Sequence, residues 1–400
     1  MKINNTGKSL LLFAFFAALI SCRDYSGGIG SRVFVIERSA GSVAVVDYRK
    51  GELVKKIEVG GDLHHASMVF DADLRYGYIA VRSGHLIRVD LQTLEKAGSL
   101  QTSESSIGLA ISRDGKVIAV SEYKPGGVTL VDVEKFEIIG RIPAKISFGG
   151  KEIVSKVTGM VDGPGNSFLC ALMDANEIWH MLPDENAAET FGYRIKRIKT
   201  PVSQPFDALI SPDSHYYITA HIGSKTASVV DLRAKDSAAA SLNLLGKDKA
   251  WNPPPKMPHM ESWGVAGEHV FVPVPGEKKL AMIDSGTMRT IRTIDMPGFP
   301  VYAVVRPDQR EIWVTFSGED HDGDIHVLDT ENGSLLREIH TGKRIYHIAI
   351  TPRGDRVLVA SNLTNELVIY ETSTYRELSR IKLDSPSGIF GSWRAFQPGL

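Results

Sequence analysis

A repeat of 42 to 53 residues constrains the fold of this chain more than any other feature of its sequence. In each unit an apolar strand leads into a turn, a β-branched strand follows, and a later strand ends at an acidic residue. The turns read Ile111-Ser-Arg-Asp-Gly115 and Ile210-Ser-Pro-Asp-Ser214. The acidic marks are Asp47, Asp90, Asp132, Asp231, Asp284, Asp329 and Glu371, and the one gap of 99 residues between them holds a degenerate unit. The sequence therefore contains eight units.

Short strands that recur at this period are typical of the four-stranded blades of a β-propeller. We name the strands of a blade A to D from the centre outward. The first unit starts abruptly at Ser31 without a strand A, whereas residues 387–396 remain after the last unit. We expect this C-terminal segment to close the ring, because closure removes an open sheet edge. The sequence thus predicts an all-β, eight-bladed propeller over residues 31–400; seven blades with an extra loop is the alternative.

The N-terminus reads as an export signal with a lipid anchor. Lys2 and Lys8 precede an apolar run over residues 10–20, which is shorter than the roughly 20 residues that span a bilayer. The run ends in Ser21-Cys22, which resembles a bacterial lipobox. We expect cleavage of residues 1–21, lipid on Cys22 and a linker over residues 22–30. Arg23 follows in place of an inner-membrane retention Asp, which favours an outer-membrane anchor in the periplasm; a plain secretory signal is the alternative.

Several functional classes are disfavoured by composition. The formal net charge is −1 and no long basic run occurs, whereas nucleic-acid binding needs clustered Lys and Arg. If Cys22 carries lipid, Cys170 is left without a disulfide partner, and its apolar surroundings predict a buried position. There is no Cys-x-x-Cys-His motif for covalent haem. No glycine pair precedes a helical segment, so a nicotinamide cofactor is not expected.

Polar residues gather at the predicted starts of strand A and in the B-to-C loops, and both sets open on the same face of a propeller. A solvated propeller mouth is polar in any case, but aligned His and Arg favour a ligand site. The first set includes His64, His65, Lys156, Thr158, Asp207, Arg344, Tyr346 and His347, and the second includes Arg82, Tyr123 and Asp174.

One long loop, residues 246–264, stands out by its composition. It carries Trp251, His259 and Trp263 around a stiff run of three prolines. Flat apolar side chains with a histidine suit a lid over a macrocycle. A packed surface loop is the alternative.

Several segments resemble a known family. Gly61-Asp-Leu-His-His-Ala-Ser67, with residues 75–84, is similar to the opening of the haem d1 domain of cytochrome cd1 nitrite reductase. The Tyr123-Lys-Pro125 turn and the Pro386-Ser-Gly-Ile-Phe390 ending extend the resemblance to nearly the whole chain beyond residue 30. Within this superfamily the chain is similar to periplasmic haem d1 biosynthesis proteins.

The resemblance implies roles for individual residues. The proximal iron ligand falls on His65, with His64 as the other choice of register; a neutral imidazole suits haem iron. Arg82 falls on a carboxylate-binding arginine and Tyr123 on a tyrosine that lines the pocket. Lys156 and Thr158 fall on a further pocket position. Arg82, Lys156, Arg344 and Arg394 are expected to meet the carboxylates of the tetrapyrrole.

Departures from the reductase decide which function is expected. Its two distal histidines fall on Asp207 and His259, which makes these the catalytic candidates: Asp207 as a general base or the holder of a water, His259 as a proton shuttle or part of the lid. No haem c domain is present to deliver electrons. The resemblance implies binding of a late precursor, dihydro-haem d1, with either a late redox or side-chain step or transport of haem d1. Expected partners are haem d1 maturation proteins and cytochrome cd1 nitrite reductase, with membrane contact through the lipid only. A propeller scaffold that binds protein is a third hypothesis.

Overall fold

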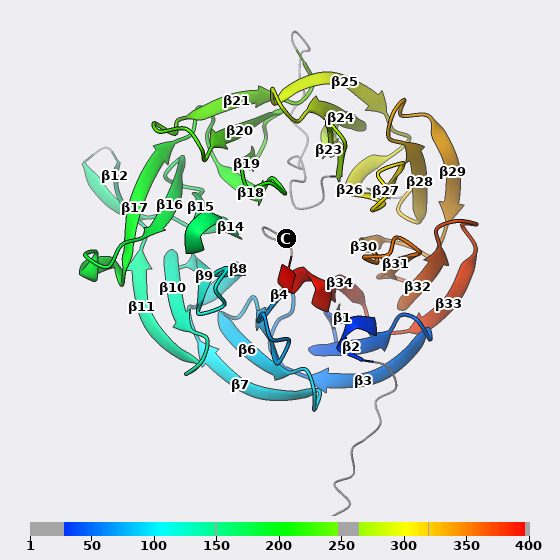
Figure 1. The fold of residues 1–400 in the computed structure, drawn as a ribbon, viewed down its shortest axis with the longest axis horizontal. Coiled ribbons are helices and arrows are strands. Elements are labelled where there is room, and N and C mark those ends of the chain that lie inside the picture. The colour runs from blue at the N-terminus through cyan, green and yellow to red at the C-terminus, as the bar shows by residue number, and fades with distance from the viewer. Residues whose placement is uncertain (1–27, 149, 247–263, 319, 397–400) are drawn as a thin grey trace, which may run out of the picture.

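Eight four-stranded antiparallel sheets surround a central axis in the computed structural model of the chain, which describes residues 28–148, 150–246, 264–318 and 320–396 (Figure 1). A separate two-stranded hairpin, β12 (Lys145–Phe148) and β13 (Lys151–Val154), lies between blades 3 and 4. The eight-bladed prediction is confirmed, and the seven-bladed alternative is wrong.

The blades follow chain order, with strands given from A to D. Blade 1 contains β34 (Pro386–Gly391), β1 (Arg32–Glu37), β2 (Ser42–Asp47) and β3 (Glu52–Glu58); blade 2 contains β4 (Ser67–Phe70), β5 (Tyr76–Ala80), β6 (His85–Asp90) and β7 (Glu95–Gln101). Blade 3 contains β8 (Ser105–Ile111), β9 (Val117–Lys124), β10 (Gly127–Asp132) and β11 (Glu137–Pro143); blade 4 contains β14 (Val157–Asp162), β15 (Phe168–Leu172), β16 (Glu177–Pro183) and β17 (Tyr193–Lys199). Blade 5 contains β18 (Pro205–Ile210), β19 (Tyr216–His221), β20 (Thr226–Asp231) and β21 (Ala239–Asn243); blade 6 contains β22 (Gly264–Ala266), β23 (His269–Val274), β24 (Lys279–Asp284) and β25 (Arg289–Asp295). Blade 7 contains β26 (Phe299–Val305), β27 (Glu311–Ser317), β28 (Asp324–Asp329) and β29 (Leu335–His340); blade 8 contains β30 (Ile345–Ile350), β31 (Arg356–Ser361), β32 (Glu366–Glu371) and β33 (Glu377–Lys382).

The ring closes where the last strand pairs with the first. In β34, Phe390 lies opposite Phe34 of β1, and Ile389 lies opposite Val35. The predicted closing strand is shorter than residues 387–396, because the chain turns after Gly391 into the 3-10 helix η5 (Ser392–Phe396). Arg394 therefore lies in a helix and not in the closing strand. The other helices are η1 (Ile29–Ser31), η2 (Pro164–Asn166), η3 (Ala188–Thr190) and η4 (Pro275–Glu277); within the described residues no helix has the length and apolar character that a membrane span requires.

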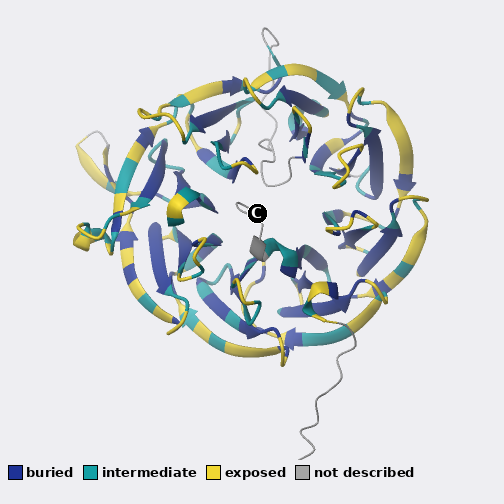
Figure 2. Cartoon of the chain, in the orientation of Figure 1, coloured by how far each residue is buried: buried dark blue, intermediate teal, exposed yellow. Residues whose placement is uncertain are grey.

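The core lies between the blades rather than at one centre. Strands B and C are buried on both faces, whereas strand D alternates between buried and exposed residues at the rim (Figure 2). Each neighbouring pair of blades shares an apolar cluster. Cys170 is fully buried in one of them, as predicted, and burial raises the pKa of its thiol.

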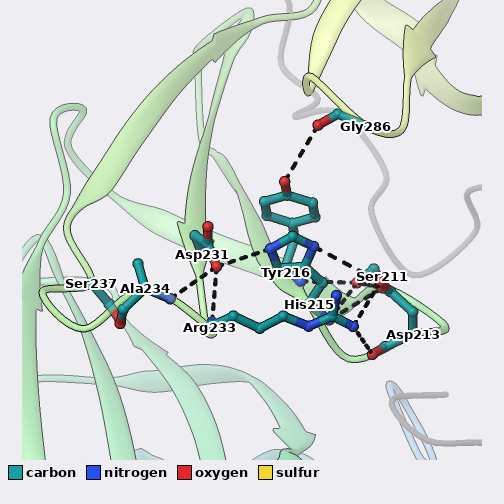
Figure 3. A network of polar contacts seen from close by, with 9 residues as sticks. All are labelled: Ser211, Asp213, His215, Tyr216, Asp231, Arg233, Ala234, Ser237 and Gly286. Carbon is teal, nitrogen blue, oxygen red and sulfur yellow. Dashed lines mark hydrogen bonds and ion pairs between the residues drawn. The ribbon is translucent and has the colours of Figure 1, made fainter.

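The repeated acidic marks have a local cause. At the end of strand C the Asp carboxylate accepts hydrogen bonds from backbone N–H groups two or three residues later, which stabilises the turn into strand D. In blade 5, Asp231 accepts from Arg233 at 2.8 Å and from Ala234 at 3.1 Å (Figure 3). In the A-to-B turn the hydroxyl of Ser211 accepts the backbone N–H groups of His215 at 3.0 Å and Tyr216 at 2.9 Å, and it donates to Asp213 at 2.6 Å.

The two faces of the disc differ in their connections. The turn face carries the short A-to-B and C-to-D turns, and the loop face carries the D-to-A and B-to-C loops. Near the loop face, strand A contains a β-bulge in several blades. The bulges lie between Ser106 and Leu109, Thr158 and Val161, Pro205 and Ala208, Pro300 and Ala303, and Ile345 and His347. Bulges re-aim side chains, so they change which residues of strand A face the central channel.

Buried His221 makes the stability of the propeller depend on pH. Its ring contacts the carbonyl of Ser203 at 2.9 Å and the hydroxyl of Ser228 at 2.7 Å, and burial lowers its pKa to about 4. The unfolded chain binds a proton near pH 6.5, so the stabilisation is present above that pH and is lost as pH falls toward 4. One such histidine contributes up to about 3 kcal/mol.

We therefore expect the His221→Gln variant to lose less unfolding free energy than the wild type between pH 7.5 and 4.5. Urea denaturation at each pH measures this. The control Ser228→Ala removes one partner but keeps the imidazole, so its pH dependence should match that of the wild type. An unchanged slope for His221→Gln would refute the assignment.

Candidate functional site on the loop face

Two arginine–tyrosine pairs bridge neighbouring blades on the loop face. The guanidinium of Arg82, in blade 2, lies over the ring of Tyr123, in blade 3, with 4.5 Å between its carbon and the ring centroid. Arg38, in blade 1, lies over the ring of Tyr346, in blade 8, also at 4.5 Å. Stacking on the rings holds both guanidinium groups in place. Their donors are thereby preorganised for an acceptor.

The two arginines occupy the same position in the propeller repeat. Arg38 donates its backbone N–H to the carbonyl of Ser385, and Arg82 donates to the carbonyl of Asp62. Both residues thus begin a B-to-C loop. Sequence reasoning identified Arg82 and missed Arg38. Arg38 could have been found from its place in the repeat, because it follows strand B of the first unit as Arg82 follows strand B of the second.

His65 lies on an enlarged loop between these pairs. In blades 1, 4, 5 and 8 the accepting carbonyl belongs to the residue directly before strand A, but in blade 2 it belongs to Asp62, five residues before Ser67. The intervening Leu63 is fully buried and anchors the loop, while His64 and His65 are exposed. Both histidines therefore lie in the loop that leads into strand A of blade 2.

The surroundings of the two histidines differ. The Nδ1 of His64 contacts a carboxylate oxygen of Asp62 at 2.5 Å. Arg82 and Arg38 lie near His65. Desolvation of the imidazole is the larger cause that lowers the pKa of His65, and the positive charges of the two arginines lower it further. A lowered pKa keeps the imidazole neutral at neutral pH, which is the form that ligates iron. These contacts favour His65 over His64 as the ligand.

The residues described so far, Arg38, Tyr346, His65, Arg82 and Tyr123, are called the arc below. Blade 4 adds residues to it. The ammonium of Lys156 lies 3.0 Å from a carboxylate oxygen of Asp174, and the same carboxylate accepts the backbone N–H of Lys156. The ammonium is also 5.8 Å from the ring centroid of Tyr123. Thr158 is buried at the edge of a bulge. The predicted residues Arg82, Tyr123, Lys156 and Asp174 are therefore brought together by the structure.

The bulges position other predicted residues. Asp207 is half-buried within the bulge of β18, and Tyr346 lies within that of β30. His347 packs against Tyr302, with ring centroids 4.8 Å apart, and burial together with Arg394 lowers its pKa to about 3. The imidazole of His347 is therefore neutral at neutral pH.

The remaining predicted residues are Arg344 on the loop face, Arg394 after the closing strand, and residues outside the described part of the chain. Arg344 is exposed in the D-to-A loop of blade 8. Arg394 follows the end of β34 at the turn face, where its guanidinium lies 4.9 Å from the ring centroid of Phe390. His259, the proposed lid and Cys22 lie outside the described residues. A cavity of about 350 Å³ between blades 5 and 6 opens on the turn face, away from the arc.

The arc suits a flat anion with several carboxylates. The Nε of Arg38, the Nη1 of Arg82 and the Oγ1 of Thr158 are buried without a hydrogen-bond partner within the described residues. Buried donors of this kind need an acceptor, and a guanidinium prefers a carboxylate. No group of three or more metal-ligating side chains occurs in the described part of the chain.

The propeller fold and the histidine between two arginines are those of a haem-binding propeller domain. Residues 30–395 match the cytochrome D1 heme domain, and the chain belongs to that family. Its relatives include the proteins named NirF from Stutzerimonas stutzeri, 34% identical over 98% of this chain and 100% of that protein, and from Pseudomonas aeruginosa, 35% identical over 93% and 94%. The dihydro-heme d1 dehydrogenase of Pseudomonas aeruginosa is 28% identical over 88% of this chain and 69% of its own length. A solved structure of dihydro-heme d1 dehydrogenase NirN in complex with DHE has the same fold, with a TM-score of 0.80 at 21% identity over 93% of this chain and 77% of that one. The resemblance found in the sequence is confirmed.

We expect loss of either stacked arginine to weaken tetrapyrrole binding. A hydrogen bond to a charged group contributes about 1.5–3 kcal/mol, so Arg38→Ala and Arg82→Ala should each raise the Kd by about 10- to 100-fold. Absorbance titration measures the Kd. Arg88→Ala is the matched control, since Arg88 lies over Tyr76 and Phe136 at 4.7 and 4.4 Å but within β6. An equal loss of affinity in the control would contradict the assignment.

Proposed function

We propose that this protein binds a late haem d1 precursor, dihydro-haem d1, on its loop face during haem d1 biosynthesis. The observation that carries the proposal is the position of His65 between the Arg38–Tyr346 and Arg82–Tyr123 pairs. One imidazole supplies an iron ligand, and two guanidinium groups supply donors to carboxylates on the rim of the macrocycle. Support comes from the NirF relatives and from a relative named for action on dihydro-haem d1.

The residues of the arc have separate tasks in this proposal. His65 orients the macrocycle through its iron, and Arg38 and Arg82 fix its rotation by binding its edge. Tyr123 and Tyr346 exclude water beneath the guanidinium groups, which strengthens their electrostatic contacts. When bound, the tetrapyrrole supplies the redox-active ring system. Asp207, in its bulge, is the candidate for moving a proton at the distal side, with His259.

The decisive experiment mixes the purified protein with dihydro-haem d1 and, separately, with haem d1. We expect a shifted Soret band with a stoichiometry of one. An unchanged spectrum with both compounds would refute the proposal. Turnover with an added electron acceptor then separates an enzyme from a carrier. Product formation that is lost in Asp207→Asn assigns catalysis, whereas stable binding without product and transfer of the ligand to cytochrome cd1 nitrite reductase assign a carrier.

We also propose that the protein is a periplasmic lipoprotein that is anchored to the outer membrane through Cys22 and contacts the membrane core through its lipid only. The support is the charged and apolar N-terminus that ends in Ser21-Cys22-Arg23. Mass spectrometry of the mature protein tests this, because acylation of an N-terminal cysteine adds a defined mass. A mature chain that begins elsewhere would refute it.

A further inference from the structure

The chain emerges from the propeller on the face opposite the candidate site. Gly28 directly precedes η1, and η1 leads into the start of β1. In β1, Val33 pairs with Gly391 at the end of strand A, and Arg32 pairs with Asp47 at the end of strand C. Both partners lie next to turns of the turn face. Tyr48 fixes this arrangement, since its hydroxyl donates to the carbonyl of Gly30 at 3.1 Å.

The distance from the proposed anchor is short. Gly28 follows Cys22 by six positions in the chain, and even a fully extended chain of six residues reaches only about 20 Å. Strands of six residues are themselves about 20 Å long, so the disc is at least as thick as the tether is long. The turn face is therefore the face that the tether holds near the bilayer.

Exposed basic residues surround the point of emergence. Arg49 and Lys50 lie in the C-to-D turn of blade 1, and Arg353 lies in the A-to-B turn of blade 8. These turns are in contact, because Arg356 donates to the backbone carbonyl of Arg49 at 2.6 Å. Within the described residues, none of the three exposed side chains forms an ion pair, although Asp355 lies in the same turn as Arg353. Such a group attracts anionic headgroups.

We infer that the turn face, at blades 8 and 1, docks on a bilayer with anionic phospholipid headgroups, and that the loop face with its His65 arc is directed away from the membrane. This inference rests on the proposed lipid anchor at Cys22. It implies that the tetrapyrrole is exchanged with water-soluble partners on the open side of the disc and does not enter from the lipid.

A pair of labelled cysteines on one blade tests the orientation. Ser39, in the B-to-C loop of blade 1, and Lys50, in its C-to-D turn, are both exposed and lie at opposite ends of β2. The native Cys170 is fully buried, so a fluorescent maleimide should react with the introduced thiol alone. The full-length lipidated variants Ser39→Cys and Lys50→Cys are reconstituted on phosphatidylglycerol-containing vesicles that carry a nitroxide on the lipid headgroup.

We expect strong quenching at position 50 and quenching at position 39 no greater than with nitroxide-free lipid. Stronger quenching at position 39 would overturn the orientation. Absence of quenching at both positions would overturn the inference as well, and mass spectrometry of Cys22 then tells whether the anchor itself was missing. The Soret assay needs no membrane, so failure of the proposed function is seen separately.

The charge contribution has its own control. Arg49→Glu combined with Arg353→Glu should reduce quenching at position 50 by about half or more on phosphatidylglycerol vesicles, where several basic residues act together. Lys124→Glu combined with Lys343→Glu reverses two exposed charges of the loop face and should leave that quenching unchanged. Equal effects of the two pairs would overturn the assignment of the basic group to lipid.

Discussion

Replacing His65 with glycine should weaken binding of dihydro-haem d1 by at least about tenfold, equivalent to about 1.4 kcal/mol, without destabilising the propeller. The loss is expected because the variant removes the imidazole between the two stacked arginines. Glycine is the better replacement, because the backbone of His65 has a φ of 57°, which glycine adopts without strain. Absorbance titration gives the affinity, and added imidazole should restore part of the Soret shift.

His64→Ala is the matched control for this variant. His64 lies next to His65 on the same enlarged loop, but its ring contacts Asp62. We expect His64→Ala to keep the affinity of the wild type within about threefold, less than 1 kcal/mol. If His64→Ala abolishes binding and His65→Gly does not, the ligand is His64, and the register taken from the resemblance is wrong.

Truncation of Phe390 to alanine should lower the unfolding free energy by about 3–5 kcal/mol. Phe390 is 5% exposed in the closing strand, belongs to the apolar cluster between blades 1 and 2, and pairs with Phe34 of the first strand. The variant leaves a cavity at the one place where the two ends of the chain hold the ring together. Urea denaturation measures the change.

Phe299 provides the matched control for packing. It is also a phenylalanine of a strand A, in β26, but it is 38% exposed. Phe299→Ala should cost less than Phe390→Ala, by about 1 kcal/mol or more, because over a third of the surface of Phe299 stays in contact with water. Equal losses for the two variants would contradict the assignment of the loss to the burial of Phe390 in the closing strand.

Much of this architecture follows from local chemistry that a sequence displays. Asp47 and Asp231 mark the ends of strand C because each carboxylate accepts hydrogen bonds from N–H groups of the next turn. The abrupt start at Ser31 and the surplus C-terminal residues predicted closure, because a sheet edge needs a partner. The site was partly predictable because Arg82 and the His64-His65 pair lie in a B-to-C loop and before a strand A, two parts of the repeat that open on the same face.

The sequence by itself determined the number of blades and the face that carries the candidate site, since both depend on a repeat of residues near one another in the chain. It also indicated closure of the ring, because the first unit lacks a strand A and a surplus segment follows the last unit. Only the tertiary structure decided that Arg38 stacks on Tyr346, because ring closure joins segments more than 300 residues apart. It alone placed Asp207 and Tyr346 in bulges, which break the alternation from which side-chain direction is predicted. It also showed that Arg394, which was expected in the closing strand, lies in η5. Contacts across blades depend on the geometry of the closed ring, and no local pattern of residues encodes that geometry.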